Sequence, residues 1–215
     1  DGRDRFSPNR VIFFDRYNVH YVAAGDAHSA VLTTNRKGTT DNTEQLRRIA
    51  TFGKGSHGRL GNGSVYCAYE PVLVSNWPGS MENLQWKAVA CGGSHTLALG
   101  YEEVEPTSYN PLSVNTYVAA WGFGANGQLG TGYEKDHFYP IKVRFPKAVK
   151  VVDIGAGKSW SLARCLDGSL YAWGKGLRGQ LGLGKAKFSL VPRLVKTFTS
   201  FLKVSSKYAH SVSIS

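Results

Sequence analysis

A glycine-rich cassette of twelve residues, which occurs three times without a gap, is the feature that most limits how this chain can fold. Its pattern is aromatic-G-x-G-x-x-G-(Q/R)-L-G-x-G, and the three copies begin at Phe52, Trp121 and Trp173. Glycines at this density favour neither a helix interior nor a strand interior. The cassette therefore predicts a tight, fixed loop that is built three times.

A second motif, apolar-x-x-Gly-x-x-His-Ser, alternates with the cassette. Its histidine position is occupied by His28, His95, Trp160 and His210, in steps of 67, 65 and 50 residues. The two longer steps carry insertions at roughly residues 33–46 and 100–115, and without them the period is about 50 residues. The second insertion is acidic and then rich in Pro, Ser and Asn, which is typical of a protruding surface loop.

Each unit is predicted to contain about four short strands. In the third unit, apolar runs at 159–165 and 169–173 flank Asp167-Gly168, a pair that indicates a type I′ hairpin with positive φ at both residues. Further strands are expected at 148–154 and 191–195. Proline is expected to begin the outer strands, at 71, 140 and 192, because it tolerates a strand start or an edge. Near the N-terminus, strands are expected at 11–14 and 19–24.

A four-stranded meander repeated at a fixed period predicts an all-β fold, the β-propeller, in which each blade is one meander. Such a sheet has two apolar faces and needs neighbouring blades to cover them. The residues assigned a structural role in the repeat are Gly53, Gly58, Leu60, Gly61, Trp121, Gly122, Gly127, Leu129, Gly130, Trp173, Gly174, Gly179, Leu181, Gly182, His28, His95 and His210. The leucines are expected to point inward as apolar anchors, and the aromatic residues to pack in the sheet core.

The two motifs together closely resemble those of the regulator of chromosome condensation repeat family, over about residues 19–215. The resemblance implies a seven-bladed propeller, of which three to four blades are present as an incomplete ring. We expect one partial domain over 1–215, with units at about 19–88, 89–153, 154–203 and a truncated 204–215. Phe52, Trp160 and Lys207 depart from the Trp, His and Gly of the family pattern.

Positive charge is concentrated in the last third of the chain. Residues 1–139 hold 12 Lys/Arg and 13 Asp/Glu (net −1), whereas residues 140–215 hold 14 and 2 (net +12). Such asymmetry points to a polyanionic partner, whose binding would weaken with salt. A solvated basic rim, or one that faces an acidic protein, is the alternative. The candidate polyanion-binding residues are Lys142, Arg144, Lys147, Lys150, Lys175, Arg178, Lys185, Lys187, Arg193, Lys196, Lys203 and Lys207.

The chain shows no pattern that predicts enzyme chemistry. Each G-x-G-x-x-G string lacks the following helix that a dinucleotide site needs, and the G-x-x-x-x-G-K at 179–185 is followed by Ala186 instead of Ser or Thr. Equivalent histidines on different blades lie around a ring and do not converge, so we expect them to bond to backbone at blade junctions. His20, His57 and His137 are expected to be exposed and unpaired. No catalytic residue, cofactor or metal ligand is assigned.

The spacing of the cysteines and the hydropathy of the chain indicate which cellular compartment suits the protein. Cys67, Cys91 and Cys165 are an odd, scattered set without a C-x-x-C pair, which fits small buried hydrophobic residues in a reduced, intracellular compartment. No apolar run approaches the roughly 20 residues of a membrane span. Nuclear, cytosolic and mitochondrial locations all remain open.

These observations predict a non-catalytic interaction scaffold. Its partners would be other proteins of a large assembly, with RNA or DNA phosphates contacted through the basic C-terminal face. Two alternatives come from the family resemblance. One is a guanine-nucleotide exchange factor for a Ran-type small GTPase, and the other is a propeller module within a larger signalling or ubiquitin-ligase protein.

Overall fold

The fold comes from a computed structural model, which describes residues 7, 9–36, 47–103, 114–146, 149–196, 203–207 and 210–214. At positions 80, 103, 203–207 and 210–214 the side-chain environment is not described. The described residues form β-strands and three short 3-10 helices, η1 (Ile12–Arg16), η2 (Ser56–Gly58) and η3 (Gly79–Asn83).

The strands form three antiparallel sheets of four strands, each in sequence order. The first sheet consists of β1 (Tyr17–Ala24), β2 (His28–Asn35), β3 (Arg48–Gly53) and β4 (Ala68–Leu73). The second consists of β5 (Gln85–Cys91), β6 (His95–Glu103), β7 (Val114–Gly122) and β8 (His137–Lys142). The third consists of β9 (Val151–Ala156), β10 (Trp160–Cys165), β11 (Leu170–Lys175) and β12 (Phe188–Leu194). A two-stranded hairpin follows, with β13 (Lys203–Lys207) and β14 (His210–Ile214).

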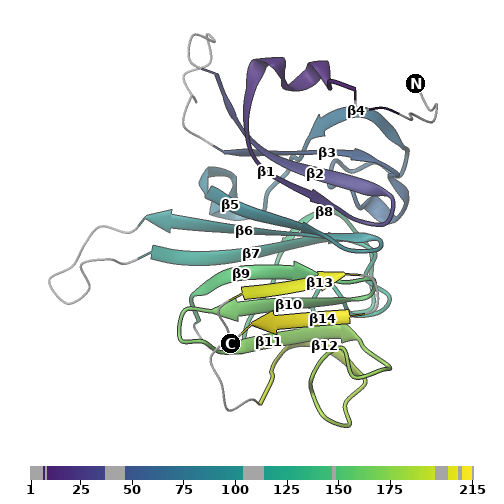
Figure 1. The fold of residues 1–215 in the computed structure, drawn as a ribbon, viewed down its shortest axis with the longest axis vertical. Helices are drawn as coiled ribbons and strands as arrows, with labels where there is room; N and C mark the ends of the chain where they lie inside the picture. Colours follow the sequence, from purple (N-terminus) through teal and green to yellow (C-terminus); the bar gives the residue numbers. More distant parts are fainter. Residues whose placement is uncertain are drawn as a thin grey trace, which may run out of the picture.

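The sheets stack face to face, from the N-terminal sheet at the top of Figure 1 to the third sheet at the bottom. The first strands of successive sheets, β1, β5, β9 and β13, contact one another in that order. This is the arrangement of propeller blades around an axis, and the ring is open. The predicted all-β propeller of four-stranded blades, present as an incomplete ring, is therefore confirmed.

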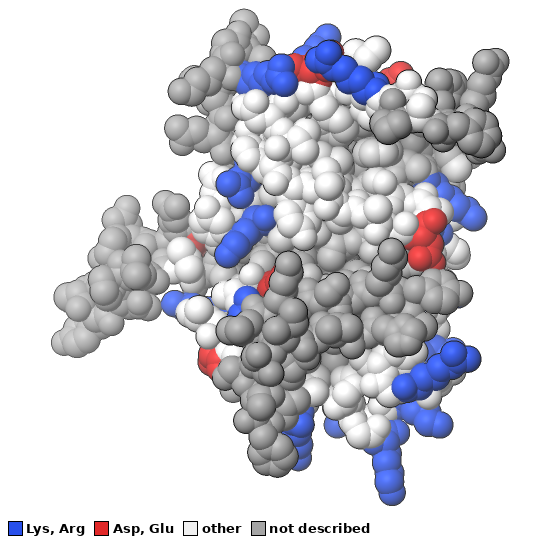
Figure 2. Space-filling view, viewed as in Figure 1, with Lys and Arg blue, Asp and Glu red and all other residues white. Residues whose placement is uncertain are grey.

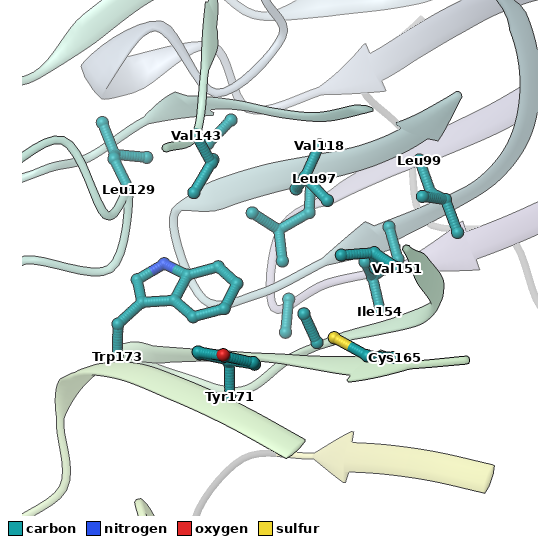
Figure 3. Close-up of a cluster of buried hydrophobic side chains, with 13 residues drawn as sticks. Leu97, Leu99, Val118, Leu129, Val143, Val151, Ile154, Cys165, Tyr171 and Trp173 are labelled. Atoms are coloured by element: carbon teal, nitrogen blue, oxygen red, sulfur yellow. The ribbon is translucent and has the colours of Figure 1, made fainter. Parts of the chain in front are cut away.

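The third sheet shows why the blades must stack. Along β11, Leu170 and Ala172 point to one face while Tyr171 and Trp173 point to the other, and all four are buried. A strand alternates its side chains between the two faces, so a strand that is apolar at every position needs a neighbour on each side. Figure 3 shows Tyr171 and Trp173 meeting Leu97 and Val118 of the second sheet.

The first and second sheets enclose a matching core. Ala30, Leu32 and Ile49 of the first sheet pack with Trp121 and other residues of the second. The face of the first sheet that points away from the second sheet is less completely buried, since Val19 and Val22 of β1 are 48% and 66% exposed. Leu60, Leu129 and Leu181 are all at most 2% exposed, so the prediction that they anchor the loops inward is confirmed.

Three local predictions were wrong. Residues 12–14 belong to η1, which Val11 precedes, and are not a strand, because the chain turns so that Phe13 stacks on Tyr17. The outer strands β4, β8 and β12 begin three or four residues before their prolines, which therefore lie inside edge strands. At the Asp167-Gly168 turn only Gly168 has positive φ, 80°, so the turn is not type I′.

The insertions are shorter than predicted. Thr33 and Asn35, which were assigned to the first insertion, are buried in β2. The second insertion was expected from residue 100, but β6 continues to Glu103 and β7 begins at Val114. Residues 37–46 and 104–113, the remainder of the two insertions, lie outside the described residues. The division into units at 19–88, 89–153, 154–203 and 204–215 remains a proposal.

Candidate interaction surface

The three glycine cassettes connect the third and fourth strands of their sheets and share the backbone conformation of four glycines, although in the first copy the sixth residue, His57, also has positive φ, 63°. In every copy, the second, seventh, tenth and twelfth residues are glycines whose φ lies between 63° and 106°. Side chains with a Cβ rarely adopt this region, so these positions require glycine. The repeated conformation places the same backbone groups at the same point of each blade.

One such group is the carbonyl of the eighth cassette residue, which accepts two hydrogen bonds from the next blade. The Arg59 carbonyl accepts from Trp121 Nε1 at 3.0 Å and from Thr96 Oγ1 at 2.9 Å. The Gln128 carbonyl accepts from Trp173 Nε1 at 2.8 Å and from Ser161 Oγ at 2.7 Å. We call these two arrangements the carbonyl junctions.

The motif histidines complete the junctions. His28 Nε2 lies 2.8 Å from Thr96 Oγ1, and His95 Nε2 lies 2.9 Å from Ser161 Oγ. Each hydroxyl has one proton and gives it to the carbonyl, so the histidine must donate its Nε2–H to the hydroxyl oxygen. The blade-junction role is thus as predicted, but the partner is a side-chain hydroxyl of the next blade and not backbone.

Both histidines are neutral in this setting. Burial, together with the nearby Arg59 guanidinium, lowers the pKa of His28 from 6.5 to about 4. Burial and the neighbouring charges of His28 and Arg59 lower the pKa of His95 to about 3. In the fold, each imidazole holds a hydroxyl in place. Trp160, in the equivalent position of the third blade, is buried and fills the space with its ring. The side chain of His210 is not described.

Arg59 is a charged residue inside the first junction, where the other copies have glutamine. Its side chain is only 4% exposed, and Nη1 donates to the Gly93 carbonyl of the next blade at 2.9 Å while Nε donates to the Ser56 carbonyl at 3.0 Å. Burial lowers the pKa of its guanidinium from the usual value. The cation is therefore held by backbone oxygens and is not presented to a partner.

Two other histidines predicted to be unpaired have partners. His20 Nε2 lies 2.8 Å from Thr34 Oγ1, and His57 Nδ1 lies 2.9 Å from Asp136 Oδ2. Asp136 also accepts from the Gly124 amide at 2.8 Å. The prediction for these two residues was wrong because the partners come from a neighbouring strand and from the next blade, which the sequence alone does not bring near.

The glycine cassettes also hold the outer strand of the next blade. The Gly63 amide donates to the Phe138 carbonyl of β8 at 3.0 Å, and the Gly132 amide donates to the Leu190 carbonyl of β12 at 3.0 Å. A Cβ on Gly58 would lie 2.6 Å from Phe138 Cα, so the strand backbone rests directly on that glycine. The first two cassette loops are thus filled by the strand backbone of the next blade.

Most of the predicted basic residues are exposed. Eight of them are exposed: Lys142, Arg144, Lys175, Arg178, Lys185, Lys187, Arg193 and Lys196. Lys150 is half-buried, Lys147 lies outside the described residues, and the side chains of Lys203 and Lys207 are not described. Six of the exposed cations lie on the third blade, and Figure 2 shows Lys and Arg side chains gathering along the lower margin of the molecule, over that blade.

Sequence reasoning missed an aromatic wedge between blades. Trp77 packs on Trp86 with ring centroids 4.2 Å apart and edge-on against Trp121 at 5.7 Å. Phe145 meets Trp173 in the same edge-on way at 6.0 Å. Trp77 lies between β4 and η3, in residues 76–83, which are rich in Asn, Pro, Gly and Ser and lack the period of the repeat. The sequence pattern that could have revealed this packing is an aromatic residue two or three positions after the valine that directly follows an outer strand.

The cysteines only partly match their prediction. Cys91 and Cys165 are buried at the ends of β5 and β10, as expected of small hydrophobic residues, whereas Cys67 is exposed. Within the described part of the chain, no three His, Cys, Asp or Glu side chains come together as a metal site. Nor does that part contain a helix with the length and apolar character to cross a bilayer.

The chain matches the model of the regulator of chromosome condensation (RCC1) repeat at residues 48–99, 118–164 and 167–214. It is 30% identical over its whole length to the ultraviolet-B receptor UVR8 of Arabidopsis thaliana, of which it covers 43%. It is 31% identical to the human X-linked retinitis pigmentosa GTPase regulator and 33% identical to the human probable E3 ubiquitin-protein ligase HERC3, and covers 17% and 15% of them. The chain therefore spans less than half the length of these curated relatives.

Among solved structures, the fold resembles yeast RCC1 (Prp20) as seen in its complex with Kap60. The TM-score is 0.67 at 21% identity, and the match covers 94% of this chain and 42% of that one. At this identity the likeness concerns the fold alone.

Equivalent glycines in filled and open cassettes should respond differently to alanine. Gly58 and Gly179 have φ of 75° and 84°, so both substitutions cost similar backbone strain, about 1–2 kcal/mol. Among the described residues no atom lies within 4 Å of a Cβ on Gly179, so only Gly58→Ala also collides with a strand. We expect Gly58→Ala to lower the free energy of unfolding by about 1–3 kcal/mol more than Gly179→Ala, measured by urea denaturation. Equal losses would contradict the assigned packing.

Acid should destabilise the junctions. Because the folded pKa values of His28 and His95 lie below 6.5, the unfolded chain binds more protons as the pH falls, and stability is lost below about pH 6.5. Between pH 7 and 5 the free energy of unfolding should fall by on the order of 2 kcal/mol per histidine. Urea unfolding at a series of pH values measures this. The matched control is His28→Gln/His95→Gln, whose pH dependence should be flatter, and an unchanged dependence would count against the assignment.

Proposed function

The chain belongs to the regulator of chromosome condensation (RCC1) repeat family, and from that premise we propose that it is a non-catalytic β-propeller interaction module. Its basic C-terminal side, centred on the third blade, is proposed to dock on nucleic acid or a nucleoprotein assembly, with other proteins of that assembly as further neighbours. The observation that carries this proposal is the group of exposed cations on the third blade.

Support for a non-catalytic role comes from how the polar residues are used. The repeated histidines are neutral and committed to the carbonyl junctions. The one buried arginine of the cassettes is held by backbone carbonyls. A general base must instead present a free lone pair to a substrate within hydrogen-bond reach. The repeated residues thus serve the fold, and function is left to the residues that differ between blades.

Support for a polyanionic partner comes from the charge balance of the third blade. Over residues 149–196, the exposed or half-buried cations outnumber the acids, which are Asp153 and Asp167 alone. Net positive charge of this kind raises the association rate and affinity for phosphate backbones without reading their sequence. No recognition helix is present in the described residues to read base edges, so the proposed contact is independent of nucleotide sequence.

A guanine-nucleotide exchange factor for a small GTPase is the second candidate. It is favoured by the 31% identity to a protein named as a GTPase regulator. The assay is nucleotide release from a Ran-type GTPase in the presence of the full-length protein, and an unchanged release rate would reject this candidate. A module within a larger ligase or signalling protein is compatible with either function, since the relatives are much longer than this chain.

Charge reversal tests the polyanion proposal. Arg144, Arg193 and Lys196 are exposed on the basic side, and the variant that replaces all three by Glu should bind single-stranded RNA or duplex DNA at least tenfold more weakly. Affinity of the parent protein should fall linearly with the logarithm of the salt concentration, with a slope of about −0.7 to −0.9 per phosphate contact. Fluorescence anisotropy at several salt concentrations measures both quantities.

The matched control reverses three exposed cations of the first two blades, Arg16, Lys54 and Lys87. It changes the net charge by the same amount but leaves the basic side intact. Equal losses for the two triple variants would indicate a general charge effect, and undiminished binding by the basic-side variant would remove the polyanion part of the proposal.

A further inference from the structure

The first strand of each sheet contains a one-residue β-bulge at the same place. Counted against the neighbouring strand, the extra residue is His20 in β1, Lys87 in β5 and Val152 in β9. Each lies five positions before the glycine of the second motif. A bulge bends its strand and redirects the side chain of the extra residue. The bulge is therefore part of the fold of all three blades, whereas the side chain that it presents differs from blade to blade.

The bulge of the second blade borders a cavity of about 420 Å³, which is the size of a small-molecule site. Its lining comes from β5, β6 and β7 of the second blade, from the start of β9 in the third, and from Arg47, which directly precedes β3 of the first. We call it the bulge cavity. All four strands of both the second and the third blade are present, so its walls belong to a complete blade junction.

The inner part of the bulge cavity is apolar. Leu99 of β6 and Val151 of β9 line it, are each 2% exposed, and belong to the core between the second and third blades. Figure 3 shows these two side chains near each other at one end of that core. Val114 and Val152, which are half-buried, continue the apolar lining toward solvent. A ligand that enters the cavity therefore meets a hydrocarbon surface at its inner end.

The outer part of the bulge cavity is positively charged. Lys87 is exposed on the bulge, and Arg47 is half-buried beside it, with Nη1 donating to the Trp86 carbonyl at 3.4 Å. This bond crosses from the first blade to the second and holds the guanidinium next to the bulge. Neither cation is paired with a carboxylate among the described residues, and none of the described lining residues is acidic.

A hydroxyl group adds a third polar contact. Thr116 Oγ1 accepts a hydrogen bond from the Val151 amide at 2.8 Å, which joins β7 to β9 across the blade junction. Because the oxygen acts as an acceptor there, its own O–H is left to donate, and it has no acceptor among the described residues. The wall of the cavity is thus fixed by a hydrogen bond and still presents a donor.

The repeat does not require this set of cations. The equivalents of Lys87 are His20 and Val152, and the equivalents of Arg47 are Thr116 and Gly168, counted from the glycine motif and from the cassette. Only the second blade, with its neighbour, therefore brings two cations to this place. Residues that serve the fold recur in each unit, whereas residues that differ between units are available for function.

We propose that the bulge cavity binds a small organic carboxylate with an apolar body. The apolar body lies against Leu99 and Val151, and the carboxylate accepts from Lys87 and Arg47 at the outer end. This site is separate from the basic side of the third blade and goes beyond the proposed function.

The chemistry of the lining selects this class of ligand. Small-molecule sites are mostly apolar, with a few polar groups that set the orientation of the ligand. A guanidinium matches a carboxylate in geometry, and a hydrogen bond between charged groups is roughly twice as strong as a neutral one. A nucleic-acid backbone has no apolar part to place against Leu99 and Val151, so the same cations alone do not make this a phosphate-chain site.

The probe is 2-naphthoate, and the measurement is an NMR titration of the 215-residue chain with labelled methyl groups. We expect saturable, one-site shifts of the Leu99 and Val151 methyl signals, because the naphthalene ring lies on them. The methyl signals of Val19 and Val22, on the exposed face of the first sheet, should stay unchanged. The neutral analogue 2-naphthalenemethanol should bind at least tenfold more weakly, since it lacks the charge.

Two kinds of variant test the assigned contacts. Lys87→Gln/Arg47→Gln should weaken naphthoate binding at least tenfold, whereas the control Lys54→Gln, at an exposed cation of the first cassette, should not. Val114→Phe should abolish binding, because the larger side chain fills the cavity. Its matched control, Val114→Ala, enlarges the cavity and should retain binding.

The outcomes separate this inference from the proposed function. The inference would be overturned by the absence of saturable shifts, by equal binding of the alcohol, or by undiminished binding to both Lys87→Gln/Arg47→Gln and Val114→Phe. Shifts of the Val19 and Val22 signals alone would also overturn it, because the probe would then bind to an exposed sheet face. RNA binding by Lys87→Gln/Arg47→Gln should match that of the parent, so a failure of either proposal leaves the other standing.

Discussion

The structure depends on a backbone carbonyl that is shared between blades. In each carbonyl junction, the eighth residue of a glycine cassette offers its oxygen to an indole N–H and a hydroxyl of the next blade, as Gln128 does for Trp173 and Ser161. The acceptor is buried, so losing its partners would leave a desolvated oxygen at a cost of about 1–3 kcal/mol. Each carbonyl junction therefore depends on four parts together: the glycine loop, the tryptophan, the hydroxyl and the histidine. Its repetition fixes how successive sheets are oriented.

This dependence separates the residues that build the propeller from those that can serve a partner. In the first two junctions, the repeated residues are buried or bonded across the junction, including those that resemble catalytic or nucleotide-binding groups, such as His95 and the first two G-x-G-x-x-G strings. The residues that vary lie at the rim. Among these, the third blade has the largest group of exposed cations. The proposed interactions follow from that difference.

Much of the fold could be predicted because its signals are local and repeated. The cassette period predicted the blades, and the inward leucines, such as Leu129, were found buried. The partner of His95 could not be predicted, because Ser161 is 66 residues away and belongs to the next blade. Trp77 was missed since it lies in a stretch without the period of the repeat. The charge excess was evident from composition, but only the fold shows which cations share a blade and which, like Arg59, are buried inside a junction.

A double-mutant cycle on one carbonyl junction tests this account most directly. Trp173→Phe and Ser161→Ala each remove one donor to the Gln128 carbonyl, and either change alone leaves the oxygen with the other donor. The loss of unfolding free energy in the double variant should exceed the sum of the single losses by about 1–2 kcal/mol, because only then is the buried oxygen unpaired. Losses that add to within about 0.5 kcal/mol would contradict the claim that the shared carbonyl couples the blades.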